Sequence, residues 1–301
     1  MFKAEVIKDS ISAFSSKRMT TFVVTFPRFI LPEFNTHRAT SKNGASSRAI
    51  SLKTAIKKVK DNPFIPFYWG AAQSGMQADQ ELSVEKIEEA KKLWLEAMNS
   101  AIYYAEKLGD LGLHKQLASR LLEVFSYQTM IVSGTEWDNF FALRADRDAQ
   151  PEFQKLAYMM LEAYNQSKPV IKCVGEWHIP FEDKMPEGIS DVEKIKIACA
   201  RCAAVSYNNH DGEIGLDKGL SIYDRLLNSR LIHASPSEHI ARVNGDLNPS
   251  GNLTGGWKQY RKMLEKETVN NDVRVTKWRI MNGELWSQVG SLYPASPFVK
   301  S

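Results

Sequence analysis

The feature that most constrains the fold is a long helical pattern over residues 84–108, where apolar side chains recur at the spacing of one helix face. Ser83 precedes this pattern and is suited to capping its first turn. Further helical patterns predict helices at 117–130, at 151–164, at 191–204 and at 216–228. A capping-box pattern of Thr135 and Asp138 predicts a short helix that carries the residues from Asn139 to Arg144. Much of the chain is therefore expected to pack as helical layers.

A strand is expected at 19–26, because β-branched and aromatic residues dominate the run MTTFVVTF and Pro27 closes it. The segment 180–190 contains prolines, a glycine and acidic residues, and we expect an exposed connection there. The segment 244–256 is rich in Gly, Asn and Pro, and we expect a mobile loop there. The chain is therefore expected to combine strand and helix.

The composition is that of an ordinary globular chain, since 43% hydrophobic residues in a total of 301 suffice for a sizeable core. No apolar run is long enough for a membrane helix, and the start, MFKAEVIKDS, lacks the apolar core of a signal peptide. We therefore expect a cytoplasmic protein. The net charge of +4 is small for this size and does not by itself indicate a nucleic-acid partner.

The chain has three cysteines, and a number that is both small and odd argues against a disulfide framework. Cys199 and Cys202 form a C-x-x-C, but they lie inside the helical pattern 191–204, where a spacing of three places both on one helix face. No second cysteine pair or neighbouring histidine completes a ligand set. A packed helix face is favoured over a metal site.

The first polar cluster runs from Thr36 to Arg48 and reads THRATSKNGASSR. Small residues from Gly44 to Ser47 let backbone N–H groups approach a ligand, while hydroxyls and the Arg48 guanidinium match phosphate oxygens. The residues alone fit an anion site and also fit a polar turn that caps the helix of the following AISLKTAIKKVK segment. Both interpretations stay open.

The second polar cluster runs from Thr135 to Glu152 and places Arg144 near a helix end beside Phe and Leu residues. A fixed cation in such a partly dry pocket would stabilise an anion strongly. The alternative is a surface ion pair between Arg144 and Asp148 at helical spacing. The residues alone favour neither.

The third polar cluster is HASPSEH, from His233 to His239. Ser235 before Pro236 is held extended and Glu238 follows where a helix can begin, so polar side chains project from a rigid turn. Serine hydrolase chemistry is disfavoured, because sequence neighbours rarely reach the relay geometry and no G-x-S-x-G elbow is present.

Together the three clusters resemble the flavin-dependent thymidylate synthases. The family signature R-H-R-x-x-S-x-N-x-x-S-x-R is matched in register by His37, Arg38, Ser41, Asn43, Ser46 and Arg48. The element N-x-x-x-L-R-x-x-x-x-A-Q-x-E is matched by Asn139, Leu143, Arg144, Ala149, Gln150 and Glu152. The element H-x-[ST]-P-x-E-H is matched by His233, Ser235, Pro236, Glu238 and His239, and an A-A-x-V-S-[FY] element has its counterpart at 203–207.

The resemblance implies an α+β fold in which a small antiparallel sheet packs with several long helices. It implies one domain over 1–301, with signature elements at 19–50, 117–160 and 191–240 and a C-terminal tail at 257–301. In the common form of the family the third element precedes the first, whereas here it follows the second. This order implies a circularly permuted variant, which is tolerable when termini fall at exposed places.

The resemblance also implies an activity, the reductive methylation of dUMP at C5 to dTMP. FAD would be the cofactor, with NADPH and 5,10-methylenetetrahydrofolate as co-substrates. The residues implied near FAD are His37, Arg38, Asn139, Ser206, Ser235 and Glu238. Those implied around dUMP are Glu33, Ser46, Ser47, Arg48, Arg120 and Arg144, with Arg144 as the activating catalytic cation. His233 would meet the folate, and a homotetramer would share each site between subunits, with no nucleic acid, membrane or metal involved.

Four positions depart from the family pattern: Thr36 stands for an Arg, Glu33 for a Gln, Gly44 for a Glu and Ser237 for a Phe. A lost cation and a gained carboxylate beside the nucleotide leave the choice of pyrimidine open. One alternative is methylation or hydroxymethylation of another pyrimidine nucleotide such as dCMP. Two others are a non-catalytic nucleotide-binding relative and RNA binding through basic runs such as KKVK.

Overall fold

The computed structural model describes residues 1–207, 214–227, 232–264, 275–281 and 284–289. The chain divides into two compact units, Met1–Lys262 and Met263–Ser301. Within its described residues the second unit holds an antiparallel hairpin of β9 (Val275–Met281) and β10 (Glu284–Val289). The single domain over 1–301 stays a prediction.

The first unit is organised around a five-stranded sheet of order β3-β4-β2-β1-β5. Its strands are β1 (Lys3–Ser12), β2 (Arg18–Pro27), β3 (Thr40–Gly44), β4 (Tyr127–Gly134) and β5 (Val170–Lys172). The pairings are antiparallel except for the short parallel pairing of β1 with β5. The α+β class is confirmed, with a sheet that is mixed at one edge.

The central strand β2 is the strand expected at 19–26, and it is buried on both faces. Phe22, Val24 and Phe26 point into the larger apolar core, whereas Val23 packs into a second core on the opposite face. Successive side chains of a strand alternate between faces, so a strand covered on both sides must be apolar almost throughout. This fits the run MTTFVVTF, in which the hydroxyls of Thr20, Thr21 and Thr25 each have a side-chain hydrogen-bond partner.

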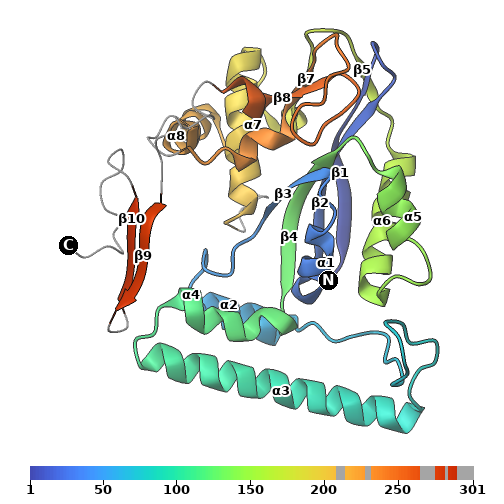
Figure 1. The fold of residues 1–301 in the computed structure, drawn as a ribbon, viewed down its shortest axis with the longest axis vertical. Helices are drawn as coiled ribbons and strands as arrows, with labels where there is room; N and C mark the ends of the chain where they lie inside the picture. The colour runs from blue at the N-terminus through green and yellow to red at the C-terminus, as the bar shows by residue number, and fades with distance from the viewer. Residues whose placement is uncertain (208–213, 228–231, 265–274, 282–283, 290–301) are drawn as a thin grey trace. The chain divides into compact units, whose positions relative to one another are not determined.

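Helices cover both faces of this sheet. The helices of the first unit are α1 (Leu31–Asn35), α2 (Leu52–Asp61), α3 (Val84–Asp110), α4 (Lys115–Ala118), α5 (Asp138–Arg144), α6 (Pro151–Gln166), α7 (Asp191–Val205) and α8 (Leu216–Leu227). Short 3₁₀ segments are η1 (Arg28–Ile30), η2 (Ser119–Phe125), η3 (Glu182–Lys184), η4 (Ser235–His239) and η5 (Tyr260–Met263). Figure 1 shows α5 and α6 on one side of the sheet and α7 on the other, as the two cores require.

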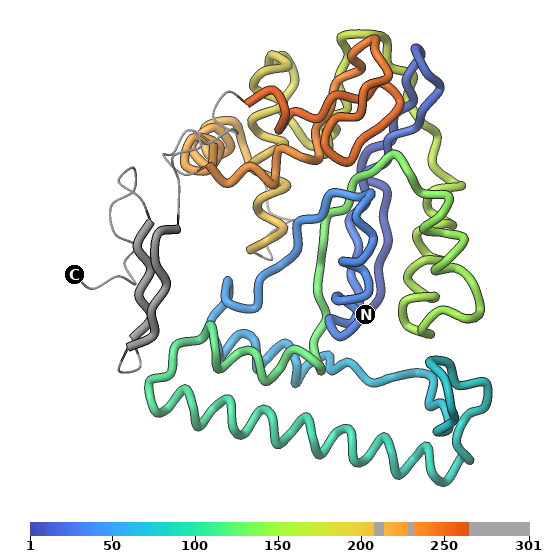
Figure 2. The backbone as a smooth tube through the Cα atoms, viewed as in Figure 1, coloured from blue at the N-terminus to red at the C-terminus, as the bar shows by residue number. Residues whose placement is uncertain are grey.

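The long helix α3 confirms the pattern at 84–108 and packs on α2 and η2 through a core of its own. Met98, Ile102 and Ala105 supply one side of that core, and Ile56 and Leu122 supply much of the other. The chain path in Figure 2 leaves α2 through an extended segment before it turns back into α3. The helices expected at 151–164, 191–204 and 216–228 are also confirmed within the described residues.

The helix expected at 117–130 is wrong over most of its length. A short α4 and the 3₁₀ segment η2 end at Phe125, and Tyr127–Gly134 form strand β4. The reason is tertiary: β4 lies between β2 and β3 and pairs with both. Strand pairing across two neighbours outweighs a helical spacing of apolar residues.

The expected capping box of Thr135 and Asp138 is also wrong, although the helix that it was to open exists as α5. Trp137 is the N-cap residue and makes no side-chain cap. The Thr135 hydroxyl instead accepts a hydrogen bond from the backbone N–H of Thr254 at 3.1 Å. The C-x-x-C expectation is confirmed, because Cys199 and Cys202 are fully buried on α7.

A small second sheet of order β6-β7-β8 contains β6 (Trp177–His178), β7 (Ala241–Val243) and β8 (Trp257–Gln259). The segment 244–256 connects β7 to β8 as the expected loop, yet it buries Leu253 against Met19 and Trp257. In 180–190, Phe181 is buried and adopts a φ of 60° before η3. Both loops are therefore only partly exposed.

A chain of buried polar groups, here called the polar seam, joins the two sheets and η4. The hydroxyls of Thr21 and Ser133, on neighbouring strands, lie 2.7 Å apart. Thr21 Oγ1 lies 2.8 Å from Nε2 of His178, whose Nδ1 lies 2.9 Å from the Ser10 hydroxyl. Ser133 Oγ lies 2.9 Å from Nδ1 of His239. The seam therefore fixes where η4 sits on the sheet.

The polar seam predicts a loss of stability in acid. Burial lowers the pKa of His239 to about 3 and the pKa of His178 well below its usual value. Both rings stay neutral in the folded protein but protonate near pH ~6.5 when the chain unfolds. The unfolded state then binds more protons, so the free energy of unfolding should fall below this pH by roughly 1 kcal/mol per pH unit for each ring. Urea unfolding across this pH range measures the slope.

A pair of variants isolates the contribution of His239. His239→Asn should reduce the dependence of the unfolding free energy on pH, because one buried titrating ring is removed. His233→Asn is the matched control, since His233 is exposed just before η4. An equal slope in His239→Asn and in the unmodified protein would contradict the burial of a neutral His239.

Candidate functional site

The signature segment Thr36–Arg48 is a strand followed by a turn. Thr40–Gly44 form β3, and the turn that follows is held by hydrogen bonds from the Ala45 N–H to the Thr129 carbonyl at 2.9 Å and from the Ser46 N–H to the Ser206 carbonyl at 3.0 Å. Ser51 then caps α2 by accepting from the Thr54 N–H. The helix-cap interpretation holds for Ser51, while the residues from Ala45 to Ser47 line a cavity.

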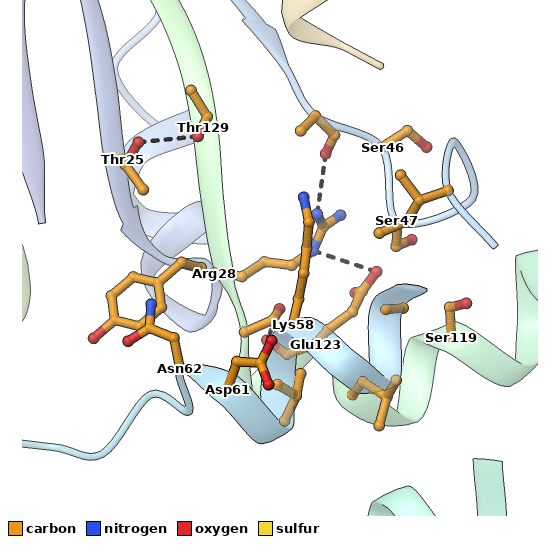
Figure 3. Close-up of a pocket in the computed structure, with 17 residues that line it drawn as sticks. Thr25, Arg28, Ser46, Ser47, Lys58, Asp61, Asn62, Ser119, Glu123 and Thr129 are labelled. Carbon is orange, nitrogen blue, oxygen red and sulfur yellow. Dashed lines mark hydrogen bonds and ion pairs between the residues drawn. The ribbon is translucent and has the colours of Figure 1, made fainter. Parts of the chain in front are cut away.

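This first cavity, here called the Arg28 cavity, has a volume of about 300 Å³ and lies between the sheet, the turn after β3, α2 and η2. Its lining includes Thr25, Arg28, Ser46, Ser47, Lys58, Asp61, Asn62, Ser119, Glu123 and Thr129. Figure 3 shows the Arg28 side chain reaching towards Glu123, with Ser46 and Ser47 beyond it. The cavity is rich in hydroxyl groups and has a cation in its wall.

Arg28 is held in place by two contacts. Its Nη1 donates to the Ala45 carbonyl at 3.1 Å, and its Nε lies 3.3 Å from Oε1 of Glu123. Glu123 also pairs with Arg120 at 2.8 Å. Burial lowers the pKa of Arg28, and the Glu123 carboxylate opposes that effect. Arg28 is therefore a desolvated cation whose charge is only partly compensated.

A second cavity of about 440 Å³, here called the Glu238 cavity, lies where β3 meets η4 and the chain after β8. Its lining residues are Asn35, Arg38, Thr40, Lys42, Glu238, Gly251, Asn252, Gln259, Arg261 and Lys262. Arg261 forms an ion pair with Glu238. The Gln259 amide donates to Asn252 Oδ1 at 3.0 Å and to the Ser41 hydroxyl at 3.2 Å, which fixes the polar wall.

Lys42 brings a second desolvated cation into the site. Burial lowers the pKa of Lys42 to about 8. Its ammonium donates to the His37 carbonyl and lies 5.4 Å from the centre of the Phe34 ring. An anion in the Glu238 cavity would stabilise this charged form.

Arg144 and His37 form the most specific contact among the predicted site residues. The Nε of Arg144 donates to Nε2 of His37 at 2.8 Å, and the guanidinium carbon lies 4.9 Å from the centre of the Phe153 ring. Burial, then the nearby Arg144 and Lys42 cations, lower the pKa of His37 to about 4. A neutral ring can accept the hydrogen bond, so His37 orients Arg144 without competing for a proton.

The surface ion pair considered for Arg144 is not present. In the described part of the chain Asp148 lies 3.6 Å from Arg147, at the surface, while Arg144 is turned towards His37 and Phe153. Among the described residues, the two terminal nitrogens of Arg144 have no protein acceptor. The pocket interpretation of the second cluster is therefore the one that the structure supports.

The structure brings several of the predicted site residues together. His37 contacts Arg144, Arg38 and Glu238 line one cavity, and Ser46 is tied to Ser206. Ser47 lines the Arg28 cavity. Six others face solvent in a single chain: Glu33, Arg48, Arg120, Asn139, His233 and Ser235 are exposed. One chain alone therefore assembles part of the predicted constellation.

Sequence reasoning missed Arg28, Lys42, Ser119 and Arg261 as cavity residues. Lys42 lies inside the signature at a variable position, so only its burial identifies it. Arg28 carried a weak signal, because a cation directly after the apolar strand and Pro27 must sit at the edge of the core. Nothing in the sequence singled out Ser119 or Arg261.

Two departures from the family pattern have local physical reasons. A Cβ at Gly44 would meet the ends of the Gln128 and Met130 side chains, so the glutamate of the family pattern would require both side chains to shift. The Thr36 hydroxyl donates to the carbonyl of Glu33 at 2.6 Å and so closes the end of α1. Thr36 is exposed and contributes no charge to either cavity.

The described residues contain no group of His, Cys, Asp and Glu side chains arranged to hold a metal ion. Nor does any helix in the described ranges have the length and apolar character needed to cross a membrane.

The family model for thymidylate synthase complementing protein matches residues 10–170, which is more than half of the chain. The chain therefore belongs to this family, and the family resemblance inferred from the sequence motifs is confirmed. The match ends before the elements at 191–240, so the circular permutation stays a prediction.

Two solved structures illustrate the likeness. The chain is 18% identical to a UMP/dUMP methylase, PolB, from Streptomyces cacaoi bound with 5-Br UMP, over 57% of this chain and 90% of that one, with a TM-score of 0.47. For the same protein bound with 5-Br dUMP the identity is 15%, the coverage 57% and 92%, and the TM-score 0.45. No curated protein matches the chain.

The contact between Arg144 and His37 predicts a measurable electrostatic coupling. Arg144→Gln should raise the pKa of His37 above its value of about 4, because a nearby cation is removed while burial is kept. NMR titration of the histidine ring protons measures the shift. Arg147→Gln, at a side chain that is 91% exposed, is the matched control and should leave the titration of His37 unchanged. An unaltered His37 titration in Arg144→Gln would contradict the contact.

Proposed function

We propose that this chain is a flavin-dependent thymidylate synthase, which methylates dUMP at C5 to give dTMP with methylenetetrahydrofolate and NADPH. The observation that carries the proposal is the hydrogen bond from Arg144 to His37. It joins the residue expected to activate the pyrimidine to a residue of the flavin signature. Membership of the thymidylate synthase complementing family supports the same activity.

The Glu238 cavity fits the polar part of a flavin nucleotide. Arg38 and Lys42 present cations that match a pyrophosphate, and the amides of Asn252 and Gln259 can hydrogen-bond polar groups. Burial lowers the pKa of Lys42, so an anion beside it is favoured. The residues proposed to hold FAD are His37, Arg38, Asn139, Ser206, Ser235 and Glu238. When bound, FAD supplies the hydride chemistry between NADPH and the transferred carbon.

In the proposed reaction Arg144 sets the electronic state of the substrate. Its permanent cation lies against the N3 and carbonyl edge of the uracil ring, which favours the ionised ring and raises the electron density at C5. Phe153 and the neutral His37 hold the guanidinium plane, so little reorganisation is needed. The terminal nitrogens that lack a protein acceptor are the ones available to the base.

The remaining substrate contacts are proposed from the signature. Ser46, Ser47 and Arg48 hold the 5′-phosphate, with Arg120 and Glu33 also beside the nucleotide, and this binding aligns C5 with the folate methylene. His233 is proposed to meet the folate. A homotetramer that shares each site would bring the exposed residues of one subunit to the cavities of another. A cytoplasmic location remains an expectation from the sequence.

The permuted order is also part of the proposal. The third element packs beside the first, since η4 adjoins the Glu238 cavity and Ser206 accepts from the Ser46 N–H. Elements that are far apart along the chain therefore lie side by side, as a permuted chain with a conserved site requires.

The direct test is the mass of the product. Purified protein is incubated with methylenetetrahydrofolate, NADPH and either dUMP or dCMP, and the nucleotide is weighed by mass spectrometry. We expect a gain of one methyl group on dUMP and a flavin absorbance spectrum from the protein. A product only from dCMP would move the reaction to another pyrimidine nucleotide, and a hydroxymethyl product would change the group that is installed. A protein that takes up no FAD and converts neither nucleotide would indicate a binding relative.

Arg144→Ala tests the role of the activating cation. We expect turnover of dUMP to fall by about 100- to 1,000-fold, because a charge that stabilises the reacting state is lost. The flavin spectrum should persist, since Arg144 is not among the residues proposed to hold FAD. Arg147→Ala is the matched control at an exposed neighbouring arginine and should retain activity. Near-normal turnover in Arg144→Ala would refute the assignment.

A further inference from the structure

The Arg28 cavity concentrates buried polar atoms that the protein leaves without a hydrogen-bond partner. Among the described residues, the hydroxyls of Ser47 and Ser119 and the Nε of Arg28 are such atoms, and all three residues line this cavity. Ser119 is only 2% exposed. Since buried polar groups are paired in the great majority of native structures, their convergence on one space indicates a polar ligand.

The guanidinium of Arg28 has donor capacity to spare. Nη1 donates to the Ala45 carbonyl, and Nε lies 3.3 Å from Glu123 without hydrogen-bond geometry. In the described part of the chain no protein acceptor contacts Nη2. A rigidly placed guanidinium with unused N–H groups matches the geometry of a phosphate oxygen pair.

The charges around the cavity select an anion over a cation. Both lining carboxylates are already paired, Glu123 with Arg28 and Arg120, and Asp61 with Lys57 at 2.6 Å. The hydroxyls of Ser47 and Ser119 have no hydrogen-bond partner, and the ion pair of Arg28 with Glu123 leaves guanidinium N–H groups free to donate. Lys58 adds a further cation to the lining. A ligand that supplies acceptors and negative charge therefore complements the cavity.

We propose that Arg28 and Ser119, together with Ser47, bind the phosphate group of a phosphate monoester in this cavity. The inference deepens the proposed function and rests on it for the identity of the ligand, which is then the 5′-phosphate of the pyrimidine nucleotide. Neither Arg28 nor Ser119 is a residue of the family motifs. The volume of about 300 Å³ is at the lower end of the range for ligand pockets.

The test measures binding rather than turnover. Inorganic phosphate and dUMP are titrated calorimetrically into the full-length protein and into Arg28→Gln, Ser119→Ala and Lys60→Gln. Arg28→Gln should weaken both ligands by about 10- to 100-fold, and Ser119→Ala by roughly 3- to 10-fold. Lys60→Gln is the matched control. Lys60 lies on α2, is exposed, pairs with Glu106 and does not line the cavity. Deoxyuridine, which lacks the phosphate, should not displace phosphate.

Ser119→Ala also separates a ligand contact from a structural role. Removing a buried hydroxyl that has no protein partner should leave the melting temperature of the free protein unchanged or raised. The rise in melting temperature caused by dUMP should become smaller. A free protein destabilised by this change would show that the hydroxyl serves the fold, and would overturn its assignment to a ligand.

The outcomes distinguish this inference from the proposed function. If Arg28→Gln and Ser119→Ala bind phosphate and dUMP as the unmodified protein does, the inference fails even when dTMP is formed. An equal loss in Lys60→Gln would indicate a diffuse charge effect and would also overturn it. Phosphate binding that depends on Arg28, in a protein that converts neither dUMP nor dCMP, would support the inference while the proposed function fails.

Discussion

The burial of β2 on both faces is the constraint on which the rest of the first unit depends. Phe22 and Val24 require the cover of α5 and α6 on one face, and Val23 requires α7 on the other. Two helical layers, one inside the family-matched segment and one beyond it, are thereby brought to one strand. The same packing carries Arg144 at the end of α5 and Ser206 at the end of α7 towards the segment that follows β2. The cavities form where these covering elements end.

Two kinds of neutral histidine follow from this architecture. In the polar seam His178 and His239 are neutral because they are fully buried, and they link strand hydroxyls to η4. His37 is neutral for a different reason, since partial burial acts together with the neighbouring Arg144 and Lys42 cations. A ring that accepts from an arginine must give up its own charge. Arg144 and Lys42 can therefore lie close to His37 because its ring stays neutral.

The sequence predicted local features well and tertiary ones poorly. The strand β2 and the long helix α3 were each predicted from the residue pattern of a single segment, and both predictions were confirmed. The strand β4 was mistaken for a helix because its conformation depends on pairing with β2 and β3, which no local pattern reveals. The site shows the same division. The family motifs predicted Arg144 and His37, which the structure places in contact, whereas Arg28 and Ser119 are recognised only from the cavity that distant segments enclose.

If the Arg28 cavity binds a phosphate as proposed, its polar lining opposes the stability of the empty fold. A desolvated guanidinium and two unpaired hydroxyls destabilise the free protein, and apolar side chains of similar size would pack there at lower cost. Such groups persist in a fold when a ligand completes their hydrogen bonds, because ligand binding to the native state alone stabilises that state. The two acidic residues of the cavity fit this account. Glu123 restrains Arg28 while sharing its charge with Arg120, so the cation is held in place and yet remains available to an anion.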